Sequence, residues 1–296
     1  MNKNKVYILE DRGVIYINGD DVKPFLQNII SNNIEKVQDN KSCSACLLTP
    51  QGKYLYDFII VKHKKGFFID CEKKIVDELL KKLKSYQLRS KIEILNLSNE
   101  FVIAVISKDK FLEFENSVTK LGHTIRFRED PVLLDPRNEN LGARLIINLE
   151  KLHLTLKQLS LKSSDVNEYY LESCNLGIPQ QYTNKLQNNI FGIECNLDEL
   201  NAIDFKKGCY VGQENTARIK LKGKLNKRLL PIEVIEGDLE NDIISVENDE
   251  IGKILINDDY PYALIKVKNE KFDFDKTFNS GSAKVKIKKP NWLQIT

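Results

Sequence analysis

The apolar positions of this chain switch repeatedly between the spacing of a β-strand and that of a helix. Runs typical of strands lie at residues 14–17, 43–48, 54–61, 67–70, 92–95 and 101–106. Between these runs, apolar residues recur at helical spacing just after Asp21 and again over residues 75–83. Single helices that alternate with pairs of strands are typical of an α+β fold rather than of a doubly wound parallel sheet.

The second half of the chain contains one further helix and then mainly short strands. The residues after Asp165 have helical spacing, and Gly177 and Pro179 end that helix. Beyond Gly223, apolar runs joined by Gly, Asn and Asp turns predict a small β-barrel or sandwich, with strands at 229–235, 243–246, 251–256, 262–267 and 283–287. We therefore predict an α+β region of two interleaved lobes over residues 1–224 and a C-terminal β-barrel over residues 225–296.

Charge and composition narrow the classes of function. The 296 residues carry a formal net charge of only +3, so electrostatics give no case for direct binding of nucleic acid. No apolar run approaches the ~20 residues that a membrane helix needs, and no targeting segment precedes the first strand-like run. We therefore expect a cytoplasmic protein whose partners include neither a membrane nor a nucleic acid.

The six cysteines are expected to be free thiols, because they are scattered through a long chain without a signal peptide. The three histidines lie far apart, so we expect neither a metal site nor catalysis by a Ser–His or Cys–His pair. Cys43 and Cys46 form a CxxC motif, but residues three apart in a strand point to opposite faces, which disfavours a redox or zinc pair. A cluster shared by Cys195, Cys209 and a third thiol is an alternative, although iron–sulfur ligation usually requires cysteines grouped in sequence.

The strongest chemical signature is the run Lys206-Lys207-Gly208-Cys209-Tyr210-Val211-Gly212-Gln213-Glu214. Its single cysteine stands between two glycines, which let a ligand approach the backbone, and directly follows two lysines. A short helix is expected to begin near Gly212, so that Cys209 lies just before a helix N-terminus. Both the helix and the lysines favour a thiolate. The alternative is a cysteine that fills a tight corner of the fold.

Polar side chains after the cysteine offer further ligand contacts. Glu214 can accept a hydrogen bond from an amino group, Gln213 can both donate and accept, and Arg218 can hold a carboxylate. The structural alternative for Arg218 is an ion pair with a nearby glutamate. A series of basic residues follows, either as a solvated strand face or as a cradle for a polyglutamate tail or an acidic partner. These residues are Lys220, Lys222, Lys224, Lys227 and Arg228.

The cysteine run together with Arg218 resembles the signature of the YgfZ-type folate-binding proteins. This family includes a mitochondrial iron–sulfur maturation factor and is related to the glycine cleavage T-protein, an aminomethyltransferase. The resemblance spans most of the chain, although only the cysteine run is highly specific. The supporting segments are 25–27, 31–34, 48–53, 57–58, 86–91, 135–137, 141–144 and 177–179.

The resemblance implies a T-protein-like folate-binding fold, with mixed α/β lobes around a central channel and a small C-terminal β-barrel. It implies tetrahydrofolate or a derivative as cofactor and a role in assembling or repairing [4Fe–4S] enzymes. Cys209 would be the functional thiol and could hold a cluster transiently. The protein would be a monomer, and its partners would be iron–sulfur assembly or client proteins. The residues implied to face or support the channel are Asn33, Gln51, Asp57, Arg89, Lys207, Gly208, Gly212, Gln213, Glu214 and Arg218.

Two departures from the family pattern bear on the reaction. Asn33 stands where the family commonly has an aspartate, and an amide cannot act as a general base. Residues 173–175 lack the arginine expected before the Gly-Ile-Pro element. A folate-dependent aminomethyl or one-carbon transferase is therefore the second hypothesis, behind an accessory protein that acts through Cys209. Direct tRNA modification is a third hypothesis, which the near-neutral charge disfavours, while an indirect effect through a client enzyme fits the first.

Overall fold

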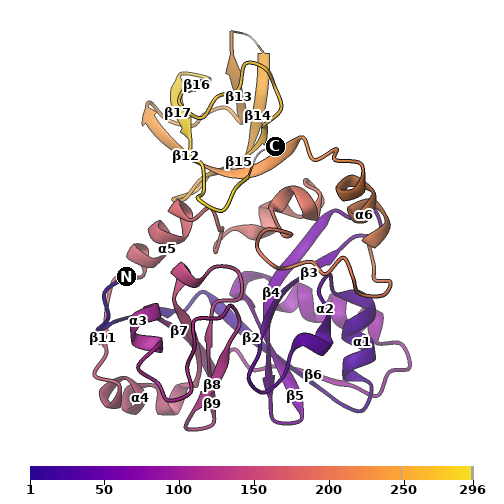
Figure 1. Ribbon diagram of the computed structural model, residues 1–296, viewed down its shortest axis with the longest axis vertical. Coiled ribbons are helices and arrows are strands. Elements are labelled where there is room, and N and C mark those ends of the chain that lie inside the picture. Colours follow the sequence, from indigo (N-terminus) through magenta and orange to yellow (C-terminus); the bar gives the residue numbers. More distant parts are fainter. Residues whose placement is uncertain (248, 295–296) are drawn as a thin grey trace. The chain divides into compact units, whose positions relative to one another are not determined.

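The computed structural model describes residues 1–247 and 249–294, which form two compact units (Figure 1). The first unit comprises Met1–Leu48, Tyr56–Tyr169 and Leu200–Val211. The second unit comprises Thr49–Leu55, Tyr170–Glu199 and the chain from Gly212 onward. The chain therefore crosses between the units several times, and the cysteine run is divided between them after Val211.

One sheet of the first unit is antiparallel and carries two helices. Its strand order is β3 (Cys43–Leu48), β4 (Tyr54–His63), β5 (Gly66–Glu72), β2 (Arg12–Asn18) and β6 (Glu93–Asn96). Helix α1 (Val22–Ile29) buries Phe25, Leu26 and Ile29, which fall on one face at helical spacing. Helix α2 (Val76–Gln87) buries Val76, Leu79 and Leu83 in the same way. Both helices lie where the apolar spacing predicts them.

The other sheet of the first unit has six strands. Their order is β11 (Lys162–Ser163), β1 (Lys5–Leu9), β7 (Phe101–Ile106), β10 (Ala143–Asn148), β9 (Asp130–Leu134) and β8 (Thr124–Phe127). Strands β7 and β10 are almost entirely buried and supply much of the local hydrophobic core. Short helices α3 (Lys108–Phe111) and α4 (Leu152–Gln158) follow β7 and β10 in the chain.

A network of buried charges connects these two sheets. Arg144 on β10 donates from Nη1 to Asp70 Oδ2 on β5 at 2.8 Å and from Nε to Asp135 Oδ2 at 3.0 Å. Arg12 on β2 donates to the other oxygen of Asp70 at 2.7 Å, and Arg137 donates to both oxygens of Asp135. We call these five residues the ion network; each is less than a tenth exposed. Opposite charges within it satisfy one another across the sheets.

The second unit contains a closed antiparallel barrel. Its order is β12 (Lys227–Glu236), β15 (Tyr262–Lys266), β14 (Asp249–Ile256), β13 (Ile243–Val246), β16 (Thr277–Ser280) and β17 (Ala283–Ile287), which pairs with β12. Inward-facing isoleucines and Phe278 fill the barrel, and Trp292 packs against this core while its indole donates to Leu176 O at 2.7 Å. Helix α6 (Gln213–Leu221) precedes the barrel, and most of α5 (Val166–Asn175) also belongs to this unit.

The predicted α+β architecture with a C-terminal barrel is confirmed. The predicted boundary at residues 224 and 225 lies just before β12, whereas the compact second unit also includes Thr49–Leu55, Tyr170–Glu199 and α6. The last two residues of the predicted barrel domain, 295–296, lie outside the described residues. No helix within residues 1–247 and 249–294 is long and apolar enough to cross a membrane.

Candidate functional site

Cys209 differs from the other five cysteines in its exposure to solvent. All six cysteines lie within the described residues and are free thiols, and only Cys209 is exposed. Its neighbour Gly208 is also exposed, and no atom lies within 4 Å of the position that a Cβ would take there. The thiol therefore stands on an open stretch of backbone that a ligand or a protein can approach.

Lys207 anchors the chain directly before this open stretch. Its ammonium donates three hydrogen bonds to the carbonyl oxygens of Gln27 (2.7 Å), Ile30 (2.7 Å) and Asn32 (2.9 Å). These carbonyls lie at the C-terminal end of α1, where backbone acceptors lack helical partners and a cation is favoured. Burial lowers the pKa of Lys207 to about 8, while the charge of Asp204 opposes that shift. All three donors of Lys207 are thus used within the fold.

Further bonds hold the segment on both sides of Cys209. Before it, the Asp204 amide donates to Ser31 O at 3.1 Å, and Lys36 pairs with the Asp204 carboxylate at 2.8 Å. After it, the Val211 amide donates to Asn28 O at 3.2 Å. The Gly208–Cys209 stretch is therefore a short exposed loop fixed at both ends to the α1 region.

Asn33 lies beside this anchor but has a local structural task. Its side-chain oxygen accepts a hydrogen bond from the Glu35 amide at 3.0 Å and caps a short 3-10 helix, Ile34–Lys36. The preceding Asn32 is buried and donates to Ser44 O and Asn201 O at 2.7 and 2.8 Å. Asn33 is half-buried. The structure thus brings Asn33 and the Lys207–Cys209 segment to the same end of α1.

Asp57 and Arg89 occupy other elements of the first unit. Asp57 is half-buried on β4, and its charge acts on Arg12 and Cys71, which places it near the ion network. Arg89 is exposed in the loop after α2 and forms no ion pair with any described residue. No hydrogen bond recorded within residues 1–247 and 249–294 joins Arg89 to the cysteine segment.

In the second unit, the predicted hairpin turn lies against the start of α6. Asn215 on α6 donates to Gln51 O at 2.9 Å. Gly52 has φ +81°, and a Cβ there would lie 3.1 Å from Gly212 O and 3.2 Å from Thr216 Oγ1. The glycine therefore serves both a left-handed turn and a close approach to the helix. Gln51 and Gly212, far apart in sequence, are neighbours in this unit.

The polar residues of α6 are available to a ligand. Gly212, with φ +86°, precedes the first helical residue Gln213, which is half-buried. Glu214 and Arg218 are exposed one turn apart, and Arg218 donates to Asn215 Oδ1 at 2.7 Å rather than pairing with a glutamate. A carboxylate and a guanidinium on one helix can bind an amino group and a carboxylate respectively.

The CxxC pair is buried in β3. Cys43 and Cys46 are 5% and 0% exposed, and Cys46 donates to Leu47 O. Burial raises the pKa of Cys43 to about 12, although nearby lysines oppose the shift. A buried thiol that stays protonated is a poor nucleophile and metal ligand. Within residues 1–247 and 249–294, no group of three or more His, Cys, Asp or Glu side chains is arranged to hold a metal ion.

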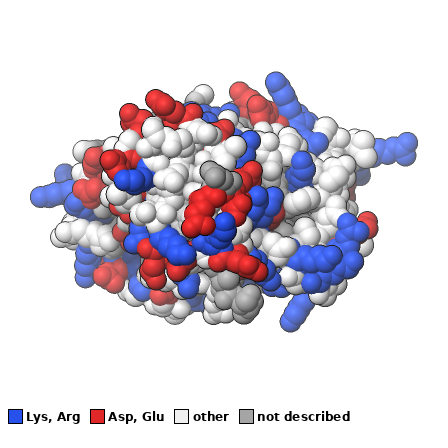
Figure 2. Space-filling view, turned by 90° about the horizontal axis from the view of Figure 1, so that it is seen from above, with Lys and Arg blue, Asp and Glu red and all other residues white. Residues whose placement is uncertain are grey.

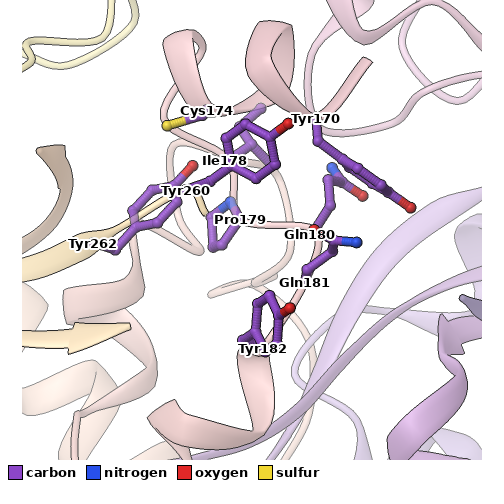
Figure 3. A pocket seen from close by; sticks show the side chains of 9 residues that line it. All are labelled: Tyr170, Cys174, Ile178, Pro179, Gln180, Gln181, Tyr182, Tyr260 and Tyr262. Carbon is purple, nitrogen blue, oxygen red and sulfur yellow. The ribbon is translucent and has the colours of Figure 1, made fainter. Parts of the chain in front are cut away.

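A small cavity of the second unit lies beside the Gly-Ile-Pro element. Side chains from α5, from residues 178–182 and from the β14–β15 connection meet there (Figure 3). Its volume of about 10 Å³ is room for roughly one water molecule. None of the predicted site residues lines it. The lining residues are Tyr170, Cys174, Ile178, Pro179, Gln180, Gln181, Tyr182, Tyr260 and Tyr262.

Several residues that shape the candidate site were not predicted to have that role. Ser31 and Asn32 hold the cysteine segment through bonds to Ala202 O and Asn201 O, and Asn215 and Thr216 fix the start of α6. The spacing of the motif could not identify the first pair, because their partners lie about 170 positions away in sequence.

Comparisons with known proteins identify relatives and a fold. A Dictyostelium discoideum protein named "Iron-sulfur cluster assembly factor IBA57 homolog, mitochondrial" is 30% identical over 267 residues, which is 81% of this chain and 65% of that protein. Proteins of the same name from Neurospora crassa and Pyricularia oryzae are 33% and 31% identical, each over 75% of this chain and 52% and 56% of their own lengths. The chain thus spans about half to two thirds of the length of these relatives. No family model matches the sequence.

The fold matches that of an aminomethyltransferase whose structure has been solved. The crystal structure of glycine cleavage system aminomethyltransferase T from Bartonella henselae superposes with a TM-score of 0.76 and covers 98% of this chain and 86% of that one. The sequences are only 9% identical, so this likeness establishes the fold alone.

The same relatives correct one prediction and confirm another. The expectation of a cytoplasmic protein is contradicted, because all three relatives are named as mitochondrial. The absence of a recognisable targeting pattern in the first residues was the wrong basis for that expectation. The resemblance carried by the cysteine run is confirmed: over most of its length this chain is similar to proteins named as IBA57-type iron–sulfur cluster assembly factors, and it has the fold of the glycine cleavage T-protein.

Proposed function

We propose that this protein is an accessory factor in the assembly or repair of [4Fe–4S] enzymes and that it acts through Cys209. The observation that carries the proposal is the exposed Cys209 thiol on a loop whose two ends are fixed by Lys207 and Val211. A thiolate can ligate iron or attack a disulfide only when it is accessible. The names of the relatives support the same process, and we propose the mitochondrion as its compartment.

The cluster in this proposal is cargo, held while it passes to a partner. One cysteine cannot complete the ligand set of an iron–sulfur cluster, which generally needs four protein ligands. The remaining ligands would come from an assembly or client protein, whose approach the open backbone at Gly208 and Cys209 permits. The partners would thus be iron–sulfur assembly or client proteins.

We further propose that the fold binds a reduced folate, tetrahydrofolate or a derivative. Two exposed side chains of α6 are candidate contacts for such a molecule: Glu214 can accept a hydrogen bond from an amino group, and Arg218 can hold a carboxylate. Gln51 and Gln213 are further candidates from the same unit. For Asn33, Asp57, Arg89, Lys207 and Gly208, which belong to the first unit, a role in folate binding stays a prediction from the family resemblance. A bound folate would supply a one-carbon carrier, and the residues of this chain would bind and orient it.

The aminomethyl or one-carbon transferase stays the second candidate. Asn33 caps a 3-10 helix with its side-chain oxygen and has no carboxylate to take a proton. Turnover of an aminomethyl-lipoyl donor with tetrahydrofolate would establish transfer, and its absence beside intact folate binding would favour the accessory role.

Two experiments test the two parts separately. Expression of this chain in cells that lack their own factor should restore the activity of [4Fe–4S] enzymes, and failure by a stable, correctly localised protein would overturn the assembly role. Calorimetric titration with tetrahydrofolate should show saturable binding that a Gln213→Ala/Glu214→Ala variant loses. Binding that the variant retains would remove α6 from the folate site, and no binding by folded wild-type protein would overturn the folate proposal alone.

A further inference from the structure

A hollow on the outside of the barrel collects lysines from several elements. It has a volume of about 350 Å³ and lies wholly within the second unit, where β12, β14 and β15 meet the 3-10 helix Thr183–Leu186. We call it the lysine hollow. Its lining residues are Lys185, Asn189, Lys227, Asp242, Glu250, Lys253, Ile254, Leu255, Leu264 and Lys266.

The strand register sets like charges opposite each other in this hollow. Lys227 on β12 is directly across from Lys266 on β15, and Lys253 on β14 is across from Leu264. Like charges that face each other across a ladder destabilise a sheet. The pair of facing lysines, Lys227 and Lys266, therefore does not stabilise the barrel, which suggests that they bind a negatively charged group.

The carboxylates near the hollow neutralise only part of this charge. Lys266 pairs with Glu250 at 2.9 Å, and Lys185 pairs with Asp258 at 2.5 Å. Lys227 and Lys253 are exposed and form no ion pair with any residue in the described ranges. The hydrogen bond from Lys266 lowers the pKa of Glu250, and the charges of Lys266, Lys227 and Lys253 add to that shift. One carboxylate therefore lies in the field of three lysines.

Apolar side chains lie between the lysines. Leu255 and Leu264 are half-buried on β14 and β15, and Ile254 is buried beside them. An occupant that covers these side chains must have apolar groups as well as negative charges, because burying apolar surface contributes most of the favourable free energy of docking.

We propose that the lysine hollow docks an acidic segment of a partner protein in which carboxylates alternate with apolar side chains. Ammonium groups match carboxylates one by one, and the leucines match the intervening apolar residues. The described barrel is closed, so the segment binds through side chains rather than as an added strand. The lysine hollow shares no residue with the cysteine run, and this proposal does not depend on the role of Cys209.

A nucleic acid fits the hollow less well than an acidic peptide. Asp242 and Glu250 also line it, so carboxylates and apolar side chains separate the lysines. A peptide can place its carboxylates against the lysines alone, whereas the evenly spaced phosphates of a nucleic acid would meet Asp242 and Glu250 as well. Basic and acidic side chains are interspersed on the face shown in Figure 2, without one broad basic surface. The net charge of +3 gives no long-range attraction of the size that nucleic-acid binding uses.

The test measures the fluorescence anisotropy of a fluorescein-labelled hexapeptide of alternating glutamate and leucine, titrated with the full chain in about 150 mM salt. Wild-type protein should bind this peptide, and Lys227→Glu/Lys253→Glu should weaken binding by roughly tenfold or more. Peptides with glutamine in place of glutamate, or serine in place of leucine, should bind much more weakly than the probe. A Lys227→Gln/Lys253→Gln variant gives the same comparison with less risk to folding, which thermal unfolding checks.

A matched control separates a specific site from general attraction. Lys276→Glu/Lys286→Glu makes the same change in net charge at exposed barrel positions outside the hollow and should bind the peptide as the wild-type does. Equal weakening in both double variants, or no binding by the wild-type, would overturn the proposal. Tighter binding of a labelled oligothymidylate than of the peptide would also overturn it and would assign the surface to nucleic acid.

Discussion

The ion network and the cysteine segment are both rich in charge and in motif residues, but their chemistry is used in opposite ways. In the ion network, three arginines and two aspartates are buried, and the charges face one another at 2.7 to 3.0 Å. In the cysteine segment, Lys207–Cys209, the buried Lys207 ammonium donates to three backbone carbonyls, and the thiol of Cys209 is exposed. The first region holds two sheets together, and the second leaves a thiol exposed to solvent.

The contrast suggests a rule: a charged or polar group whose hydrogen bonds are all made within the protein is structural, and a candidate functional group is one that can still bind a ligand. Burial alone would raise the pKa of Asp135, but the charge and hydrogen bonds of Arg137 and the charge of Arg144 outweigh it and hold that pKa well below its ordinary value. Such a carboxylate has no capacity left for a substrate. Cys209 has that capacity, because its surroundings are fixed while its thiol is open.

The largest effect is expected from Asp70→Asn in the ion network. The change leaves Arg12 and Arg144 buried without the carboxylate that both contact, so the free energy of unfolding should fall by about 3–5 kcal/mol. Urea denaturation measures this loss. Glu236→Gln, which breaks the exposed pair with Lys284, is the control and should leave the midpoint unchanged. A loss below about 1 kcal/mol in Asp70→Asn would show that the network is not structural.

The buried side chain of His63 provides a second test, through the dependence of stability on pH. His63 is 7% exposed, stacks on Phe68 at 4.1 Å, and has no hydrogen-bond partner for Nδ1 in the part of the chain that the structure describes. Burial lowers its pKa to about 4, and the charges of Arg126 and Lys64 contribute. The unfolded chain binds the proton more tightly, so stability is full above about pH 6.5 and falls as the pH drops toward 4.

The cost of protonating His63 should be on the order of 2–3 kcal/mol at pH 4. His63→Phe should remove this part of the acid destabilisation while other groups titrate as before. Unfolding curves of both proteins between pH 7 and pH 4 measure the difference. Parallel loss of stability in both proteins would mean that His63 does not titrate with a depressed pKa.

A smaller loss is expected from Lys207→Met, which separates anchoring from ligand binding. Removal of three hydrogen bonds at the end of α1 should lower the free energy of unfolding by about 2 kcal/mol. Lys206→Met changes the neighbouring exposed lysine and should leave stability unchanged. If Lys207→Met keeps full stability but loses tetrahydrofolate binding, the ammonium serves a ligand and the anchor interpretation is wrong.

The CxxC pair gives the smallest expected change among the buried groups. Cys43→Ser/Cys46→Ser places two hydroxyls in a buried strand and should cost about 1–2 kcal/mol of stability. Because both thiols are buried, rescue of [4Fe–4S] enzyme activity per amount of folded protein should be unchanged. Loss of rescue by a folded double variant would assign these thiols a function.

The fold could be predicted from the sequence where local pattern determines structure. The run at 43–48 became β3, the spacing over 75–83 became α2, and the short strands after Gly223 became a barrel. Strands β8, β9, β10, β11 and β16 were missed. β8, β11 and β16 have only two to four residues each, and Pro131 lies within β9. β8 and β9 form a local hairpin, whereas β10 pairs with β7 as well as with β9. Because β7 lies far from β10 in sequence, local spacing carries no information on that contact.

The sequence pointed to the residues of the candidate site, but the contacts that each of them makes could not be predicted from it. The cysteine run pointed to Cys209, and its exposure agrees with a functional thiol, although its role stays a prediction. Lys207 was expected to favour a Cys209 thiolate and to face or support the folate channel, whereas its ammonium donates to carbonyls that lie 175 to 180 positions earlier in the chain. Only the folded arrangement reveals that its hydrogen bonds are already used.

The central claim is that Cys209 acts as an exposed thiol on a loop that hydrogen bonds hold at both ends. The variant Cys209→Ser tests this claim most directly. The variant should match the wild-type in urea denaturation, because the side chain is exposed. It should nevertheless fail to restore [4Fe–4S] enzyme activity in cells that lack their own factor, while the wild-type chain restores it. Full rescue by Cys209→Ser at equal protein level would contradict the account.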